Sequence, residues 1–212
     1  MPENPPSLRE RRAQLTRDEI LRAARRLFAE RGYARTSVRD VAQAAGVSAQ
    51  TVYDSVGSKH ELVSQLNDLI DAEAGVAAIV RAAAESGDPW ELAATPARVT
   101  RSIIEHCGDI VLALVSGAAA EPELGAVLAE GHRRHLEGAG RIVAQLRSLD
   151  ALGPGVDPDD AAETLAAAAD FRFALVLQES YGWSLDQLES WMAATSRTLL
   201  LRGEGPASSA GR

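Results

Sequence analysis

Apolar residues recur at intervals of three and four along most of the chain, which is the spacing of one buried face on an α-helix. The first such face is formed by Ile20, Ala24, Leu27 and Phe28. Thr16 and Glu19 precede it with the spacing of a capping box, in which two side chains satisfy backbone N–H groups reciprocally. Gly32 follows it, and glycine commonly ends a helix in the left-handed conformation. The pattern predicts an amphipathic helix between Thr16 and Gly32.

Three further helix starts follow before residue 62. Ser37 with Asp40 and Ser58 with Glu61 have the capping-box spacing, and Ser48 is a predicted N-cap. Because a glycine stands at position 46, the first of these helices ends early. The sequence therefore predicts two short helices, over residues 38–45 and 49 to about 56, and a long helix that begins near residue 59.

Longer helices, separated by glycine and proline, are predicted beyond residue 75. Proline is tolerated at the first helical position, so Pro89, Pro122 and Pro158 favour helix starts, and Gly182 favours a break. The predicted helices span residues 89–117, 121–149, 158–181 and 185 to about 201. Residues 203–212 are predicted to be a disordered tail. The sequence has no strand pattern, and the predicted fold class is all-α.

The composition agrees with a helical protein that has a real core. The chain has 212 residues, of which 46% are hydrophobic and only 4% aromatic, and alanine is abundant. Its single cysteine, Cys107, excludes an internal disulfide. No apolar run reaches the roughly 18 to 20 residues that a bilayer requires, and the N-terminus has no apolar segment typical of a signal peptide. We therefore expect a soluble, cytoplasmic chain without membrane contact.

Charge is distributed unevenly along the chain. The net charge is −8, yet residues 1–60 carry 11 Lys and Arg against 7 Asp and Glu, a net of +4, and the remainder carries −12. A basic first quarter on an acidic body is expected when one module faces phosphate and another does not. If charge alone is considered, chance clustering of solvated charges is an alternative explanation for this asymmetry.

Residues 38–52 meet the physical requirements of a helix-turn-helix. Two helices that cross after a turn of three or four residues need small side chains at the crossing, and Ala42 and Gly46 supply them. The predicted shared core is Val41, Val47 and Val52. The outer face of the second helix is Ala49, Gln50, Thr51, Tyr53 and Asp54. Such a helix fits the major groove of DNA. The alternative for this fragment by itself is an ordinary helix corner.

The longer stretch GYARTSVRDVAQAAGVSAQTVYDSVGSKHEL resembles the DNA-binding domain of the TetR (tetracycline repressor) family. The resemblance covers residues 14–74, with the helix-turn-helix at 37–56. It implies a homodimeric repressor that leaves a palindromic operator in double-stranded DNA when a small-molecule effector binds. It also implies a helical domain for effector binding and dimerisation at residues 75–202. The composition of residues 1–13, which are proline-rich and then arginine-rich, predicts a flexible basic arm.

The resemblance implies a set of DNA-contacting residues. Thr36 and Ser37 would bond a phosphate, and Arg39 would contact a guanine. Bases would be read by Ser48, Gln50 and Thr51, and phosphates would be held by Tyr53 and Lys59. Asp54 departs from the family pattern, which commonly has an aromatic residue, histidine or arginine there. An acidic side chain near phosphates would repel them. It would accept a hydrogen bond from a cytosine amino group or from a neighbouring arginine.

An effector cavity is expected among the long helices. The candidate lining residues are Trp90, Ile103, His106, Cys107, Val111, His132, Leu136, Phe171, Leu175 and Gln178, each of which fits plain core equally well. His132 and His135 have the spacing of metal ligands, but a solvated helix face explains them too. We predict no metal and no cofactor. The sequence has no catalytic motif, so a helical enzyme is the weaker alternative.

The last helices are predicted to form the dimer interface. Apolar and small residues in the final helix recur at spacings of 3, 4, 3 and 4, which suits packing between near-antiparallel helices. The predicted interface residues are Leu165, Ala169, Leu185, Leu188, Met192, Thr195 and Leu199. The alternative is that both helices pack within one subunit. A constitutive DNA-binding protein without an effector is the alternative to the ligand-responsive repressor.

Overall fold

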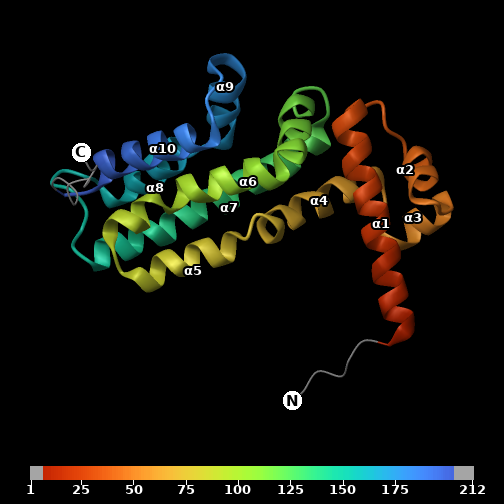
Figure 1. Cartoon of the computed structure of the whole chain (residues 1–212), viewed down its shortest axis with the longest axis horizontal. Coiled ribbons are helices and arrows are strands. Elements are labelled where there is room, and N and C mark those ends of the chain that lie inside the picture. The colour runs from red at the N-terminus through yellow and green to blue at the C-terminus, as the bar shows by residue number, and fades with distance from the viewer. Residues whose placement is uncertain (1–6, 203–212) are drawn as a thin grey trace, which may run out of the picture. The chain divides into compact units, whose positions relative to one another are not determined.

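The computed structural model describes residues 7–202, and over these residues the chain is built from α-helices (Figure 1). They are α1 (Leu8–Arg31), α2 (Val38–Ala45), α3 (Ala49–Ser55), α4 (Lys59–Glu73), α5 (Val76–Ser86), α6 (Pro89–Gly117), α7 (Pro122–Ser148), α8 (Pro158–Ala168), α9 (Phe171–Tyr181) and α10 (Leu185–Leu200). Strand-type pairing among the described residues is limited to an isolated bridge between Leu152 and Leu201. The all-α prediction is confirmed.

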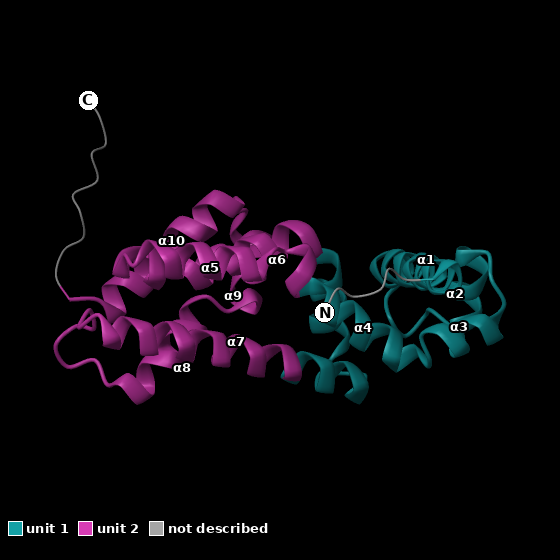
Figure 2. Ribbon diagram, turned by 90° about the horizontal axis from the view of Figure 1, so that it is seen from below, with its two compact units in different colours: residues 1–70, 108–129 teal, residues 71–107, 130–212 magenta. Residues whose placement is uncertain are grey.

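The chain divides into two compact units (Figure 2). Unit 1 consists of residues 1–70 and 108–129, and unit 2 consists of residues 71–107 and 130–212. The long helices α6 and α7 therefore contribute residues to both units. Within α6 the backbone leaves helical geometry at Cys107 (φ −133°, ψ 16°), the last residue before the chain passes from unit 2 to unit 1.

Unit 1 is organised around α1, α2 and α3, whose lengths are set by their caps. Ser37 and Asp40 form the predicted capping box of α2, and the Ser48 hydroxyl accepts the Thr51 N–H at the start of α3. Gly46 ends α2 in the left-handed conformation (φ 68°, ψ 28°), which permits the abrupt turn into α3. The largest side chains that this packing buries completely include Ile20, Val41, Val52 and Leu62.

The first helix begins earlier than the sequence pattern predicts. Ser7 and Glu10 form the capping box of α1, and Thr16 lies inside the helix, where its hydroxyl donates to the Arg12 carbonyl. The predicted cap at Thr16 is wrong, because Ser7 offers the same spacing and no glycine or proline interrupts residues 8–31. Leu8 to Ala13 of the expected arm are therefore helical. The rest of the arm that precedes Ser7 lies outside the described residues, as does the predicted tail 203–212.

Unit 2 is held together by two clusters of buried side chains. One cluster is centred on Leu92, Leu146, Leu165 and Leu200. The other joins α10 to its neighbours through Leu188 and Met192, which pack against the small residues Ala94, Ala97, Ala169 and Ala174. Alanine at these positions lets the helix backbones approach closely, because each side chain adds only one carbon atom.

Two helix boundaries in unit 2 differ from the prediction. The segment 158–181 forms two helices rather than one, since Asp170 caps α9 by accepting the Arg172 N–H. An aspartate at this point offers the backbone an N-cap in place of continued helix. In addition, α5 forms between Gly75 and Gly87, which both have left-handed backbone conformations. The sequence pattern did not predict a separate helix there.

Candidate nucleic-acid interface

Helix α3 presents a polar face to solvent on the side opposite its buried anchor. Val52 is 0% exposed, whereas Gln50, Tyr53 and Asp54 are exposed. At 100° per residue, Gln50 and Asp54 lie on the same face and Val52 lies on the reverse one. The far end of the helix is tied to α1, because Arg17 Nη1 donates to the Ser55 carbonyl at 3.0 Å. The arrangement exposes hydrogen-bonding side chains on a short, fixed helix.

Two side-chain hydrogen bonds link neighbouring turns of α3. Gln50 Nε2 donates to Asp54 Oδ1 at 2.8 Å, and the hydroxyls of Ser48 and Thr51 are 2.8 Å apart. Ser48 is exposed while its hydroxyl accepts the Thr51 N–H and shares a hydrogen bond with the Thr51 hydroxyl. Arg39 is exposed on α2, and Tyr53 is 52% exposed. These positions are accessible, and their contacts with DNA remain predictions.

The prediction for Thr36 is wrong. Thr36 is 2% exposed, and its hydroxyl lies 3.0 Å from the Gly32 carbonyl oxygen and 3.3 Å from that of Leu27. A buried hydroxyl engaged with main-chain carbonyls cannot bond a phosphate in solvent. Its neighbour Ser37 is exposed at the start of α2, where its side chain is engaged with Asp40. Thr36 therefore fastens the turn between α1 and α2, and the phosphate contact remains a prediction for Ser37.

Lys59 is held against an aromatic ring rather than extended into solvent. Its Nζ lies 3.8 Å from the centroid of the Tyr33 ring, which is a cation–π contact. Burial lowers the pKa of Lys59, while the nearby carboxylates of Glu121 and Glu123 act in the opposite direction. Burial also raises the pKa of Tyr33, with Glu123 and Glu121 adding to the shift. The contact of Lys59 with a phosphate remains a prediction. The side chain that would make it is already packed against Tyr33 of unit 1.

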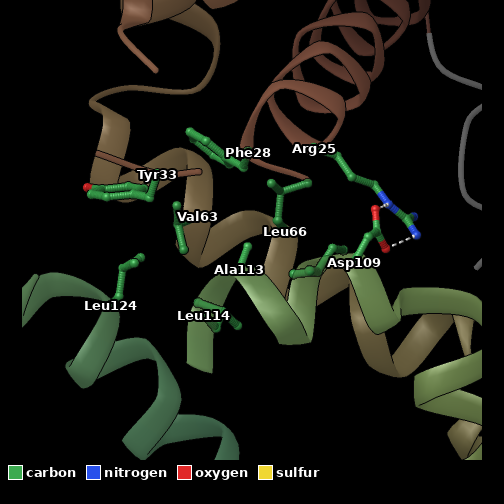
Figure 3. Close-up of a pocket in the computed structure, with 10 residues that line it drawn as sticks. Arg25, Phe28, Tyr33, Val63, Leu66, Asp109, Ala113, Leu114 and Leu124 are labelled. Atoms are coloured by element: carbon green, nitrogen blue, oxygen red, sulfur yellow. Dashed lines mark hydrogen bonds and ion pairs between the residues drawn. The ribbon is translucent and has the colours of Figure 1, made fainter. Parts of the chain in front are cut away.

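Unit 1 also contains an apolar crevice that sequence reasoning missed (Figure 3). Its lining residues are Arg25, Phe28, Tyr33, Val63, Leu66, Asp109, Ile110, Ala113, Leu114 and Leu124. At one side, Arg25 of α1 and Asp109 of α6 form a two-pronged ion pair, with both nitrogen–oxygen distances 2.7 Å. Burial raises the pKa of Asp109, but Arg25 outweighs it, and the pKa lies below its ordinary value. The sequence signal that could have identified this crevice is Asp109, a single acidic residue within an apolar run.

The predicted effector-pocket residues occupy different environments. Cys107 and Val111 are buried, His106 and His132 are exposed, and the other six are half-buried: Trp90, Ile103, Leu136, Phe171, Leu175 and Gln178. Trp90 and Leu136 pack against the core cluster around Leu92. None of the ten lines the crevice in unit 1. Within residues 7–202, no three His, Cys, Asp or Glu side chains converge as a metal site would require. The effector-pocket residues remain a prediction.

Most of the predicted dimer seam is core of the same chain. Leu165, Ala169, Leu188 and Met192 are at most 1% exposed, and Leu185 packs against the cluster around Leu188. For the four fully buried residues the prediction is wrong, because a 3-and-4 spacing identifies a buried face without identifying which chain buries it. Leu185 and Thr195 are half-buried, and Leu199 is 49% exposed. Of the seven predicted residues, these three retain surface that a partner could contact, and their place in the interface remains a prediction.

The fold and this surface define a helix-turn-helix DNA-binding protein with an additional helical unit. A profile of "Bacterial regulatory proteins, tetR family" matches residues 20–66. The chain is 35% identical over 162 residues to the HTH-type transcriptional regulator TcmR of Streptomyces glaucescens, which covers 74% of this chain and 68% of TcmR. It is 46% identical over 56 residues to the regulator TtgR of Pseudomonas putida, which covers 26% of this chain and 27% of TtgR. The chain belongs to the TetR family of bacterial transcriptional regulators.

Solved structures agree on the fold. The complex of SmeT with triclosan superimposes with a TM-score of 0.73 at 21% identity, over 93% of this chain and 98% of SmeT. SmeT is the repressor of the Stenotrophomonas maltophilia multidrug efflux pump SmeDEF. At this identity the likeness establishes the shared architecture. No helix among residues 7–202 has the length and hydrophobicity that crossing a membrane requires.

Proposed function

We propose that this chain is a ligand-responsive repressor, which binds a palindromic operator as a homodimer and releases it when a small apolar molecule binds. The observation that carries the proposal is the exposed polar face of α3 beside the tight turn at Gly46. Gln50 offers an amide to base edges, and Arg39 offers a guanidinium from the adjacent helix. Membership of a family of transcriptional regulators supports the DNA-binding part. The proposal assigns no catalytic step.

Selection from a library of randomised duplex DNA tests the DNA-binding part. We expect the full chain to enrich a two-fold symmetric sequence whose half-sites lie about one helical turn apart, roughly 34–36 Å. The Arg39→Ala/Gln50→Ala variant changes only exposed side chains, so it should keep its fold and its weak binding to random DNA. It should fail to enrich the same sequence. A wild-type protein that enriches no sequence over random DNA would contradict the proposal.

Ligand response is tested on the operator so obtained. A protein with the same fold, SmeT, forms a complex with triclosan, which makes triclosan a reasonable first probe within a panel of drug-sized apolar compounds. We expect at least one compound to raise the melting temperature of the protein and to weaken operator binding, because a ligand shifts an equilibrium only by binding one state better. If every stabilising compound leaves operator affinity unchanged, the constitutive DNA-binding protein is the better description.

We infer that the homodimer forms through an exposed aromatic patch on α9 and α10, defined by Phe173, Val176 and Trp191. All three are at least 37% exposed, and the Phe173 and Trp191 ring centroids are 5.4 Å apart. Trp183 lies edge-on to Trp191 at 6.0 Å, which fixes the indole in position. Large rigid aromatic groups are enriched at protein interfaces. The patch thus offers a second copy of the chain a surface that the buried face of α10 cannot offer.

A further inference from the structure

Asp54 departs from the family pattern, and the sequence suggested a cytosine amino group or a neighbouring arginine as its hydrogen-bond partner. The structure gives it a different partner, Gln50. Asp54 Oδ1 accepts a hydrogen bond from Gln50 Nε2 at 2.8 Å, one helical turn earlier on α3. Both residues are exposed on the outward face of α3, opposite Val52. Asp54 therefore lies where it can act on Gln50 whether or not it touches DNA itself.

We propose that Asp54 is a positioning residue that directs the Gln50 amide so that Gln50 selects adenine over guanine. The inference rests on the proposed function, since it requires α3 to face the major groove. A glutamine side chain has an oxygen that only accepts and a nitrogen with two hydrogens to donate. An ionised carboxylate only accepts, so only the nitrogen end of the amide can face Asp54. Turning the amide over would set its oxygen against the carboxylate.

The hydrogen bond leaves a specific pair of groups for a base. One Nε2 hydrogen is used by Asp54, so Gln50 retains one N–H donor and the Oε1 acceptor. Adenine presents the matching pair in the major groove, an acceptor at N7 and a donor at N6. Guanine presents two acceptors, N7 and O6. Against guanine, Oε1 would face an acceptor and only one hydrogen bond would form.

The interaction is weak on an open helix surface and stronger at an interface. In water, a glutamine–aspartate pair one turn apart contributes little, because solvent competes for both groups. When DNA excludes that water, the surroundings are less polar, and an amide turned the wrong way loses a hydrogen bond that water no longer replaces. Asp54 also carries a negative charge towards the phosphates, so it weakens binding to every sequence. Specificity is thus gained at the expense of overall affinity.

The test compares base preference in four proteins: wild type, Asp54→Asn, Gln50→Ala and the double variant. After selection from randomised duplexes, affinity is measured on the selected operator and on operators with guanine, or 7-deazaadenine, in place of the adenine read by Gln50. We expect wild type to prefer adenine over guanine, and to lose affinity with 7-deazaadenine, which lacks the N7 acceptor. Asp54→Asn should bind all these duplexes more tightly and reduce the adenine-over-guanine ratio about tenfold, within the range of one bidentate base contact. In the Gln50→Ala background, the Asp54 substitution should leave the ratio unchanged.

The chain contains a matched control. Gln14 Nε2 donates to Asp18 Oδ1 at 2.7 Å with the same four-residue spacing, but on α1. Asp18→Asn removes an equal charge and makes the same change from a side chain that only accepts to one that also donates, but away from α3, and it should leave base preference unchanged. An unchanged ratio in Asp54→Asn overturns the inference alone. The inference is also overturned if Asp54→Asn selectively loses a preference for cytosine at one operator position, because Asp54 would then read a base directly. If wild type selects no sequence, the proposed function fails and the inference with it.

Discussion

Replacing Asp109 with asparagine should weaken unit 1 measurably, because it removes one half of a two-pronged ion pair while preserving side-chain volume. Both nitrogen–oxygen contacts of Arg25 with Asp109 are 2.7 Å. The two side chains are 25% and 35% exposed, which is between a surface pair and a buried one. Exposed pairs contribute about 0.2–1 kcal/mol, and hydrogen bonds to charged groups about 1.5–3 kcal/mol. We expect a loss of about 1–2 kcal/mol in the free energy of unfolding at neutral pH.

The pH dependence of this loss follows from the pKa of Asp109. Because Arg25 holds that pKa below its ordinary value of 3.8, the folded state retains the carboxylate charge to lower pH than the unfolded state does. The stabilisation is therefore complete above the unfolded-state pKa, and it is lost as the pH falls through the folded-state pKa. The difference between wild type and Asp109→Asn should be constant near neutral pH and should shrink in acid.

Urea denaturation at fixed protein concentration measures both effects, with Arg25→Gln and the double variant completing a mutant cycle. The exposed pair of Glu19 with Arg22, at 3.3 Å, provides a control whose coupling should be near zero. A coupling free energy of zero between Arg25 and Asp109 would refute the reasoning. A difference between wild type and Asp109→Asn that grows as the pH falls would refute the sign of the pKa argument.

Three other substitutions give distinct results. Gly57→Ala should lower the free energy of unfolding by about 1–3 kcal/mol, because φ is 98° at this position and non-glycine residues are strained there; an unchanged melting temperature would contradict this. Tyr53→Phe should weaken binding by a similar factor on all DNA sequences if the hydroxyl holds a phosphate, and a change in base preference would contradict that role. Trp191→Glu should shift the chain from dimer to monomer in sedimentation without unfolding it, since the indole is already 37% exposed; an unchanged dimer would rule out the aromatic patch.

Helix starts in unit 1 were predictable because their signals are local. The capping boxes at Ser37 and Ser58 and the left-handed glycine at position 46 act within a few residues of each other. The same locality explains the error at Thr16, because two serine or threonine boxes competed and the outer one at Ser7 begins the helix. Local pattern decides where a helix can begin, and tertiary packing or a competing cap decides which start is used.

Features that depend on distant residues were not predictable in the same way. The role of Thr36 is set by carbonyl groups of α1 and the following turn, and that of Arg25 by a residue 84 positions later. The buried faces of α8 and α10 were identified correctly as apolar, but they are buried by the chain itself. Periodicity predicts which face of a helix is buried. It does not predict whether that face is covered by the same chain or by a partner.

The way α3 is held has a consequence for how this protein changes over evolutionary time. The helix is anchored through Val52 on its inner side, through the Ser48 cap at one end and through Arg17 at the other. Its outward positions, such as Gln50, contribute almost nothing to the core, and substitutions at such surface sites usually change stability by less than about 0.5 kcal/mol. New operator preferences are therefore accessible to duplicated copies of the gene by single substitutions that leave folding intact.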